Sequence, residues 1–161
     1  MNWYVVYTKP KWEKKVAEKL KEIGIECYCP LITQIKQWSD RKKKVEVPLF
    51  NSYVFVQLSD KDRNSVFQVA GVVRYLFWLG KAAIVRNEEI TIIKKSLSET
   101  NISDISVIPY KKGDKIKLES GAFSNQDAIV QEVTNTHCIL LLESLGCVLK
   151  MKYKKEPNPD L

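Results

Sequence analysis

The amino-acid sequence predicts an α+β protein in two parts, an α/β sandwich at residues 1–98 and a small β-barrel at residues 110–155. In the first part, strand-like apolar runs alternate with two segments whose apolar residues recur at helical spacing. In the second part, four or five short strand-like runs are separated by turn residues, which is typical of small barrels. Residues 99–109 lack a strong apolar period and are predicted to be a linker, and residues 156–161 a tail.

The sandwich is predicted to begin with a buried strand followed by a helix. Trp3–Thr8 is apolar, aromatic and β-branched, as a buried strand would be. Pro10 suits the first turn of a helix and Gly24 its end. One face of that helix is apolar and is formed by Trp12, Val16, Ala17, Leu20 and Ile23. The other face carries Lys11, Lys14, Lys15, Lys19 and Lys21, and is either solvated or a site for an anionic partner.

The next segments predict a hairpin and a central strand of the sheet. Cys27–Ile35, interrupted by Pro30, is a second strand region, and the basic residues 38–44 are expected to form a hairpin tip or a loop. Tyr53–Leu58 is the next strand. Because strand side chains alternate, its aliphatic residues Val54, Val56 and Leu58 face away from Tyr53, Phe55 and Gln57. If helices cover the aliphatic face, the aromatic face needs another cover, which is either part of the fold or a partner.

Residues 59–98 are predicted to complete the sandwich. Ser59–Asn64 is a polar turn, and Val72–Leu79 is another strand. Asn87 is a suitable cap for the N-terminus of a second helix. The first turn of this helix holds Glu88 and Glu89, whose negative charges interact favourably with the helix dipole. The apolar stripe of the helix is formed by Ile90, Ile93 and Leu97.

The composition favours a binding protein over an enzyme. Twenty-six Lys and Arg against nineteen Asp and Glu give a formal net charge of +7, which suits a polyanionic partner, although a basic protein without such a partner has the same charge. The six glycines are scattered and form no phosphate loop. His137 is the only histidine, and no nucleophile elbow or carboxylate pair stands out. We therefore expect no catalytic residues and no cofactor.

The cysteines and the N-terminus predict a reduced, cytoplasmic protein. The spacing of Cys27, Cys29, Cys138 and Cys147 fits no zinc site, so buried apolar thiols are expected and no metal. The N-terminal apolar run is interrupted by Lys9 and is too short for a secretory signal or a membrane span.

Six segments carry a resemblance when they are taken in order: Trp3–Thr8, Pro48–Val56, Gly71–Arg74, Ile84–Ile90, Gly113–Ile116 and Gly121–Phe123. Together they resemble the NusG family of transcription factors, which combine an NGN domain with a KOW domain. The family's Pro-Gly before the tyrosine is Asn51-Ser52 here, and its KOW glycine is replaced within Gln126-Asp127-Ala128. The late turn of the general factor reads Leu145-Gly146-Cys147. At these positions, and in the length of the linker, the sequence is more similar to the operon-specific RfaH and UpxY paralogues than to the general factor.

The resemblance implies a monomeric, non-catalytic elongation and antitermination factor that suppresses pausing and termination, for example at polysaccharide operons. In the family, an apolar cavity docks on the β′ clamp helices of RNA polymerase, and the matching residues here are Tyr7, Phe50, Tyr53, Phe55, Tyr75, Trp78 and Leu79. The non-template DNA strand would be contacted by Lys9, Lys11, Lys14, Lys15, Lys19, Arg41, Lys42 and Lys43. The simpler alternatives are that the aromatic residues only fill the core and that the cations are only solvated. The KOW domain would bind the ribosome through NusE, or mask the docking cavity.

Two other functions fit parts of the sequence. A sheet that displays Tyr53 and Phe55 could stack RNA bases as an RRM does, although the RNP1 pattern with its glycines is absent. A ribosomal KOW protein would account only for the last third of the chain. In that last third, Cys138–Leu145 contains leucines that suit a helix as well as a strand, but the β-branched Ile129, Val130 and Val133 favour the strand form.

Overall fold

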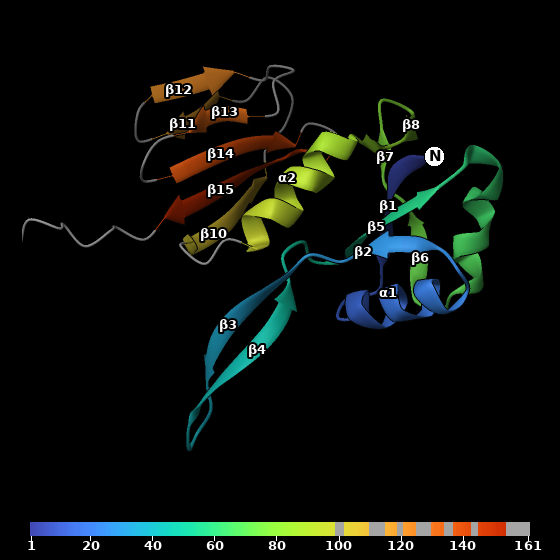
Figure 1. Cartoon of the computed structure of the whole chain (residues 1–161), viewed down its shortest axis with the longest axis horizontal. Helices are drawn as coiled ribbons and strands as arrows, with labels where there is room; N and C mark the ends of the chain where they lie inside the picture. The colour runs from blue at the N-terminus through green and yellow to red at the C-terminus, as the bar shows by residue number, and fades with distance from the viewer. Residues whose placement is uncertain are drawn as a thin grey trace, which may run out of the picture. The chain divides into compact units, whose positions relative to one another are not determined.

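The computed structural model describes residues 1–98, 102–109, 115–118, 121–124, 130–133, 137–142 and 145–153. The chain forms two compact units, Met1–Leu97 and Ser98–Leu161 (Figure 1). The division falls one residue before the end of the predicted sandwich. None of the helices in the described part of the chain is long and apolar enough to span a bilayer.

The first unit is built on an antiparallel sheet with the strand order β2-β5-β1-β6, in which β9 also pairs with β1. The strands of this sheet are β1 (Asn2–Thr8), β2 (Glu26–Tyr28), β5 (Tyr53–Leu58), β6 (Val72–Tyr75) and β9 (Ile84–Val85). The predicted division of β5 by a period of two is confirmed. Val54 and Val56 pair with Val6 and Tyr4 of β1 and belong to one buried cluster, which we call the α1 face of the sheet.

Two helical segments pack on the α1 face. Helix α1 (Glu13–Glu22) contributes Val16, Ala17 and Leu20 to the cluster, and the 3-10 segment η1 (Asp60–Gln68) contributes Val66. The helix begins at Glu13, later than predicted, because Lys11 has a φ of 65° that no α-helix accommodates. Ile23 lies beyond the helix and is 46% exposed, so its predicted place in the apolar stripe is wrong. A turn was predicted where η1 begins, because few residues of Asp60–Gln68 are apolar.

Close packing holds α1 against the sheet at two points. The carboxylate of Glu13, 4% exposed, accepts a 2.7 Å hydrogen bond from the backbone N–H of Ser52 in the turn before β5. Gly71 has a φ of +102°, and a Cβ atom there would lie 2.6 Å from the ring of Trp12. Both contacts explain local sequence choices, since an acidic residue at position 13 and a glycine at position 71 fix where the helix lies on the sheet.

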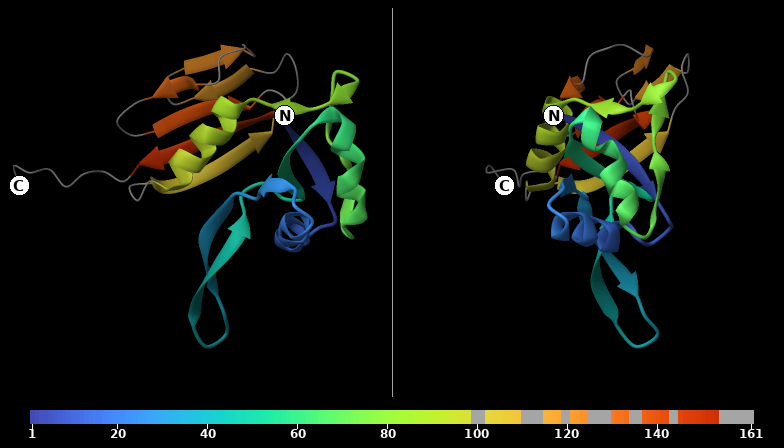
Figure 2. Two further views of the ribbon diagram at one scale, coloured as in Figure 1. Left: turned by 45° about the vertical axis from the view of Figure 1, so that its right-hand side comes forward. Right: turned by 90° about the vertical axis from the view of Figure 1, so that its right-hand side faces the viewer.

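A long hairpin leaves the sheet between β2 and β5. It consists of β3 (Leu31–Gln37) and β4 (Lys42–Pro48), paired from Leu31↔Pro48 to Gln37↔Lys42. Figure 2 shows it extending away from the rest of the first unit. The tip is shorter than predicted, because Lys42–Lys44 are already paired in β4. Most side chains of the hairpin are exposed, so hydrogen bonding between the strands holds it together rather than a core.

The predicted strand at residues 72–79 is divided in two. β6 ends at Tyr75, and β7 (Phe77–Trp78) pairs with β8 (Lys81–Ala82) in a separate short hairpin. Helix α2 (Asn87–Ser98) follows β9, and its Ile90 and Ile93 are buried as predicted, while Leu97 is half-buried. Glu89 at its start accepts a 3.0 Å hydrogen bond from the backbone N–H of Arg86, which satisfies a donor at the helix N-terminus.

The second unit contains a four-stranded antiparallel sheet and a separate hairpin. The sheet has the order β10-β15-β14-β13. Its strands are β10 (Ile102–Pro109), β13 (Val130–Val133), β14 (His137–Leu142) and β15 (Cys147–Tyr153), and the hairpin joins β11 (Lys115–Leu118) and β12 (Gly121–Ser124). Leu142, Leu149 and Met151 are fully buried.

Of three predictions for the second unit, one is wrong, one is confirmed and one is not confirmed. Residues 102–109 are not a linker, because β10 pairs along its length with β15. Residues 137–142 form a strand rather than a helix, as expected. The described strands do not close into a barrel, so the predicted closure is not confirmed. The Gly113-Asp114 and Gln126–Ala128 segments of the resemblance, and the predicted tail, lie outside the described residues.

Candidate functional site

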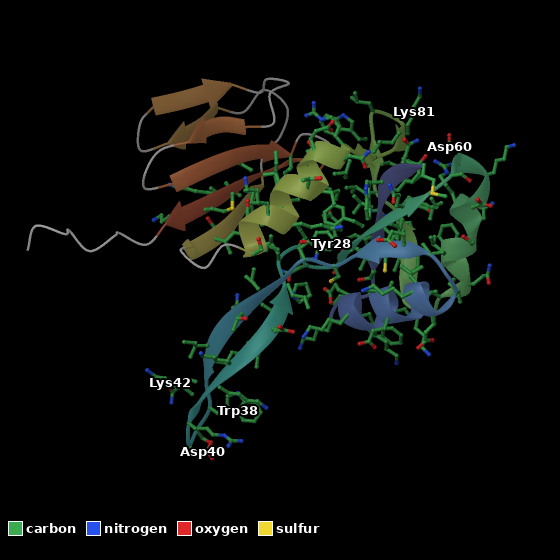
Figure 3. All side chains as sticks on the ribbon, in the orientation of Figure 1. Tyr28, Trp38, Asp40, Lys42, Asp60 and Lys81 are labelled. Atoms are coloured by element: carbon green, nitrogen blue, oxygen red, sulfur yellow. The ribbon has the colours of Figure 1, made fainter. Side chains whose placement is uncertain are left out.

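The face of the sheet opposite α1 carries a continuous set of aromatic side chains, which we call the aromatic face. The register places Trp3, Val5 and Tyr7 of β1 opposite Gln57, Phe55 and Tyr53 of β5, and Tyr28 of β2 opposite Phe55. Because directly paired residues point to the same side, all of these side chains share one face. Figure 3 shows Tyr28 beside this sheet, close to the base of the long hairpin.

The aromatic face has a fully buried part and a part-exposed part. Phe55 is 0% exposed and packs edge-on against Phe50, with ring centroids 5.7 Å apart, and parallel to Tyr28 at 6.2 Å. Tyr7 and Tyr53 are half-buried and meet edge-on at 5.7 Å. Phe50 and Phe55 therefore form the buried part of the face, while Tyr7 and Tyr53 are its half-exposed part.

Cationic side chains border the aromatic face. The guanidinium carbon of Arg74 lies 5.1 Å from the Tyr7 ring centroid. The ammonium of Lys94 on α2 lies 4.9 Å from the Tyr28 ring and 5.5 Å from the Trp3 ring. Sequence reasoning missed Trp3, Tyr28, Arg74 and Lys94 as parts of this face. The period-two alternation in Trp3–Tyr7 could have identified Trp3, but Arg74 and Lys94 depend on strand order and helix placement.

The structure separates Tyr75 from the other predicted docking residues. Tyr75 pairs with Val6 and is buried on the α1 face, where its hydroxyl donates a 2.7 Å hydrogen bond to the carbonyl of Arg63. Burial raises the pKa of the Tyr75 phenol to about 12. Its predicted place in the docking surface therefore does not fit its position. Trp78 and Leu79 lie in the β7–β8 hairpin and its turn, where Leu79 is 74% exposed with a φ of 50°.

The predicted cations form two clusters in the first unit. The α1 cluster consists of Lys9, Lys11, Lys14, Lys15 and Lys19, all exposed. The half-buried Trp12 lies beside these lysines, since the ammonium groups of Lys15 and Lys9 lie 4.5 Å and 5.4 Å from its ring. Sequence reasoning placed Trp12 only in the core. Lys19 is partly neutralised by a 3.3 Å ion pair with Glu22.

The second cluster lies at the far end of the long hairpin. We call the exposed cations Lys36, Arg41, Lys42, Lys43 and Lys44 the hairpin cluster. Trp38 lies among them, and Figure 3 shows it with Asp40 and Lys42 at the hairpin end. Both clusters combine lysines with a tryptophan, an arrangement that suits phosphate and base surfaces better than a purely charged patch does.

Of the two cysteines of the first unit, Cys27 is buried and Cys29 is half-buried, and neither is a reactive thiol. Cys27 donates a 3.2 Å hydrogen bond to the carbonyl of Ala17, and burial raises its pKa. Burial, reinforced by the Glu13 carboxylate, raises the pKa of Cys29 to about 11. Both thiols are therefore protonated at neutral pH. Among the residues that the structure describes, no group of three or more His, Cys, Asp or Glu side chains could hold a metal ion.

Comparison with known proteins places this architecture in a family. The family model described as "Transcription termination factor nusG" matches residues 1–94, which is nearly all of the first unit. The transcription termination/antitermination protein NusG of Streptococcus pyogenes serotype M3 is 27% identical over 160 residues, covering 90% of this chain and 88% of that protein. The NusG protein of Chlamydia trachomatis is 25% identical over 143 residues, covering 82% of this chain and 78% of its own length.

A solved structure is also similar. It is described as "Domain interaction in Thermotoga maritima NusG", has 22% sequence identity and a TM-score of 0.44, and the match covers 94% of this chain and 93% of that one. The family model alone spans more than half of the sequence. The chain therefore belongs to the NusG family of transcription termination factors.

Proposed function

We propose that this chain is an elongation and antitermination factor that docks on the β′ clamp helices of RNA polymerase through its aromatic face. The observation that carries the proposal is the pair Tyr7 and Tyr53, half-buried and in edge contact, on the sheet face opposite α1. Aromatic residues with rigid support dominate binding energy at protein interfaces, because they offer large contact areas at low cost in conformational entropy.

The buried phenylalanines beside Tyr7 and Tyr53 on the aromatic face suit such an anchor. Phe50 and Phe55 are almost completely buried, and their edge-on contact restricts how the face can rearrange. We therefore assign Tyr7 and Tyr53 to direct contact and Phe50 and Phe55 to support. Trp78 and the exposed Leu79 are kept as flanking contacts, and Tyr75 is left out because it belongs to the core of the α1 face.

The α1 cluster and the hairpin cluster are proposed to contact the non-template DNA strand. Lysine and arginine side chains neutralise phosphates and release counterions, which supplies affinity that is independent of sequence and sensitive to salt. Contact with both the clamp and the DNA would hold the polymerase in its elongating form. The resemblance to the RfaH and UpxY paralogues suggests action at particular operons, such as polysaccharide operons, with the ribosome reached through NusE as a partner of the second unit.

The test is the binding of core RNA polymerase, free of nucleic acid, to the full chain carrying Tyr7→Ala and Tyr53→Ala. Loss of each ring is expected to weaken binding by more than about 1 kcal/mol, which is roughly fivefold in the dissociation constant. Phe67→Ala is the matched control, since Phe67 is an aromatic residue of η1, 48% exposed, and lies outside the aromatic face. Unchanged binding by a folded double variant would refute the docking assignment.

The structure counts against base stacking by the sheet itself. An RRM-like function needs both Tyr53 and Phe55 to be available to bases. Phe55 is 0% exposed and is packed against Tyr28 and Phe50, so it has no ring surface to offer. A ribosomal KOW protein is likewise less suitable, because the family model matches the first unit and not the second.

A further inference from the structure

We propose that Trp38, at the tip of the β3–β4 hairpin, is a stacking platform for an unpaired base of single-stranded nucleic acid. The inference rests on the proposed function and extends it from phosphate contact by the hairpin cations to base contact by an aromatic ring. The juxtaposition that carries it is an exposed indole among five cations on an arm that extends from the domain.

The tip geometry presents the indole rather than burying it. The backbone N–H of Trp38 donates a 2.7 Å hydrogen bond to the carbonyl of Arg41, which closes the turn at residues 38–41. Trp38 remains 49% exposed, although an indole usually buries more of its surface. In Figure 3, Trp38 and Lys42 lie on opposite sides of the hairpin end. The closed turn therefore holds the ring at the extremity of the arm, with no hydrophobic core behind it.

A lysine shares the ring's side of the hairpin. The ammonium of Lys43 lies 5.1 Å from the Trp38 ring centroid, close enough for a cation–π interaction. Lys36 is the direct cross-strand partner of Lys43, so the two ammonium groups point to the same face. A base that stacked on the exposed part of the Trp38 ring would bring its phosphates within reach of these two lysines.

The charge pattern of the arm calls for an anionic partner. Like charges placed directly opposite each other destabilise an antiparallel pair, yet Lys36 and Lys43 occupy such a position. The hairpin has five cations and two carboxylates, Asp40 and Glu46. Along Leu31–Pro48, which the structure describes in full, no cation forms an ion pair with a carboxylate. An array of phosphates would relieve this repulsion.

The combination favours single-stranded nucleic acid over duplex or protein. In a duplex the base faces are stacked on each other and cannot meet an indole, whereas an unpaired base offers its face. A protein partner for this arm would need acidic groups and a pocket for the ring. Binding of single strands needs only the two features present here, a positively charged track and an aromatic face.

The test measures binding of labelled oligothymidylate, oligouridylate and a blunt DNA duplex to the full chain by fluorescence anisotropy. Trp38→Leu keeps an apolar side chain but removes the stacking surface, and is expected to weaken binding to the single strands roughly 5- to 100-fold. Trp38→Phe should lose less. The two single-strand probes distinguish DNA from RNA as the source of the base. Phe67→Leu is the control, because it removes an equally exposed aromatic residue outside both clusters.

Salt dependence separates stacking from charge. Trp38→Leu should leave the slope of log affinity against log salt unchanged, whereas Lys43→Gln should reduce its magnitude by about 0.7 for the phosphate contact that is lost. Binding should also quench tryptophan fluorescence in the wild type and not in Trp38→Phe. Wild-type affinity in a folded Trp38→Leu variant, or equal affinity of the wild type for duplex and single strands, would overturn the proposal.

The same variants distinguish this proposal from the docking proposal. Core polymerase without nucleic acid should bind Trp38→Leu as well as the wild type. If Trp38→Leu lost polymerase binding and kept oligonucleotide binding, the hairpin tip would be a protein contact and the stacking proposal would be wrong. If Tyr7→Ala and Tyr53→Ala left polymerase binding intact while Trp38→Leu lost oligonucleotide binding, docking through the aromatic face would fail and stacking would stand.

Discussion

The two faces of the first sheet are made by the same strands but differ in how they are covered. On the α1 face, Val54, Val56 and Leu20 are buried to 5% exposure or less in one cluster with the helix. On the aromatic face, Phe55 is buried while Tyr7 and Tyr53 remain half-exposed. Trp3, Val5 and Phe55 on the aromatic face are buried as deeply as the residues of the α1 face, so the rings that β1 and β5 leave available for contact are those of Tyr7 and Tyr53.

The largest expected difference between the faces is in stability. Leu20→Ala removes a side chain that is 0% exposed beneath the α1 face, and should lower the free energy of unfolding by about 2–5 kcal/mol. Tyr53→Ala removes a half-exposed ring and should lower it by clearly less. Urea denaturation followed by circular dichroism measures both. Equal losses would show that the aromatic face is as much a part of the core as the α1 face.

A pair of tyrosines, one on each face, sharpens the comparison. Tyr75→Phe on the α1 face removes the hydrogen bond to the Arg63 carbonyl and should cost about 1 kcal/mol at neutral pH. Tyr28→Phe on the aromatic face should cost less, because the Tyr28 hydroxyl donates no hydrogen bond to any residue that the structure describes.

The same two tyrosines predict an alkaline limit to stability. Burial raises the pKa of Tyr28, like that of Tyr75, to about 12, above the ordinary value of 10.0. The folded state favours the neutral phenols. Their contribution to the free energy of unfolding is therefore fully present below pH 10.0 and is lost as the pH rises towards 12. The dependence of stability on pH in that window should be shallower in Tyr28→Phe. An unchanged dependence in both phenylalanine variants would mean that other groups cause it.

The smallest expected effect on stability comes from the α1 cluster. Replacing Lys11, Lys14 and Lys15 with Gln should change the free energy of unfolding by no more than about 0.5 kcal/mol, because all three are exposed. The magnitude of the salt slope for binding a transcription elongation complex should nevertheless fall. Lys61→Gln, on η1, is the control for a general change in charge. A slope equal to that of the wild type would identify the cluster as a solvated surface.

Much of the first unit could be predicted because its signals are local. The alternation in Tyr53–Leu58 fixed the two faces, and the spacing of Val16 and Leu20 fixed the buried side of α1. The position of Tyr75 could not be predicted, because it depends on the register of β6 against β1, which shifts between Tyr7 and Thr8. Strand β10 was missed for a similar reason. Polar residues interrupt the apolar ones in β10, so its sequence shows little apolar periodicity. Pairing with β15 determines its conformation.

The candidate site was predictable only in part. Tyr7, Phe50, Tyr53 and Phe55 lie together, but the sequence could not distinguish the buried phenylalanines from the accessible tyrosines. The role of Trp12 within the α1 cluster was hidden by its helical spacing, which indicates a core residue.

The central claim is that the aromatic face contacts the polymerase, and a photo-crosslinker placed at Tyr53 tests it most directly. The full chain with a benzophenone amino acid at position 53 is irradiated with core RNA polymerase, and the crosslinked peptides are mapped. A chain with the same group at Phe67 on η1 is the comparison. We predict crosslinks from position 53 to the β′ clamp helices and none from position 67. Crosslinks to the clamp helices from position 67 and not from position 53, with both chains folded, would contradict the claim.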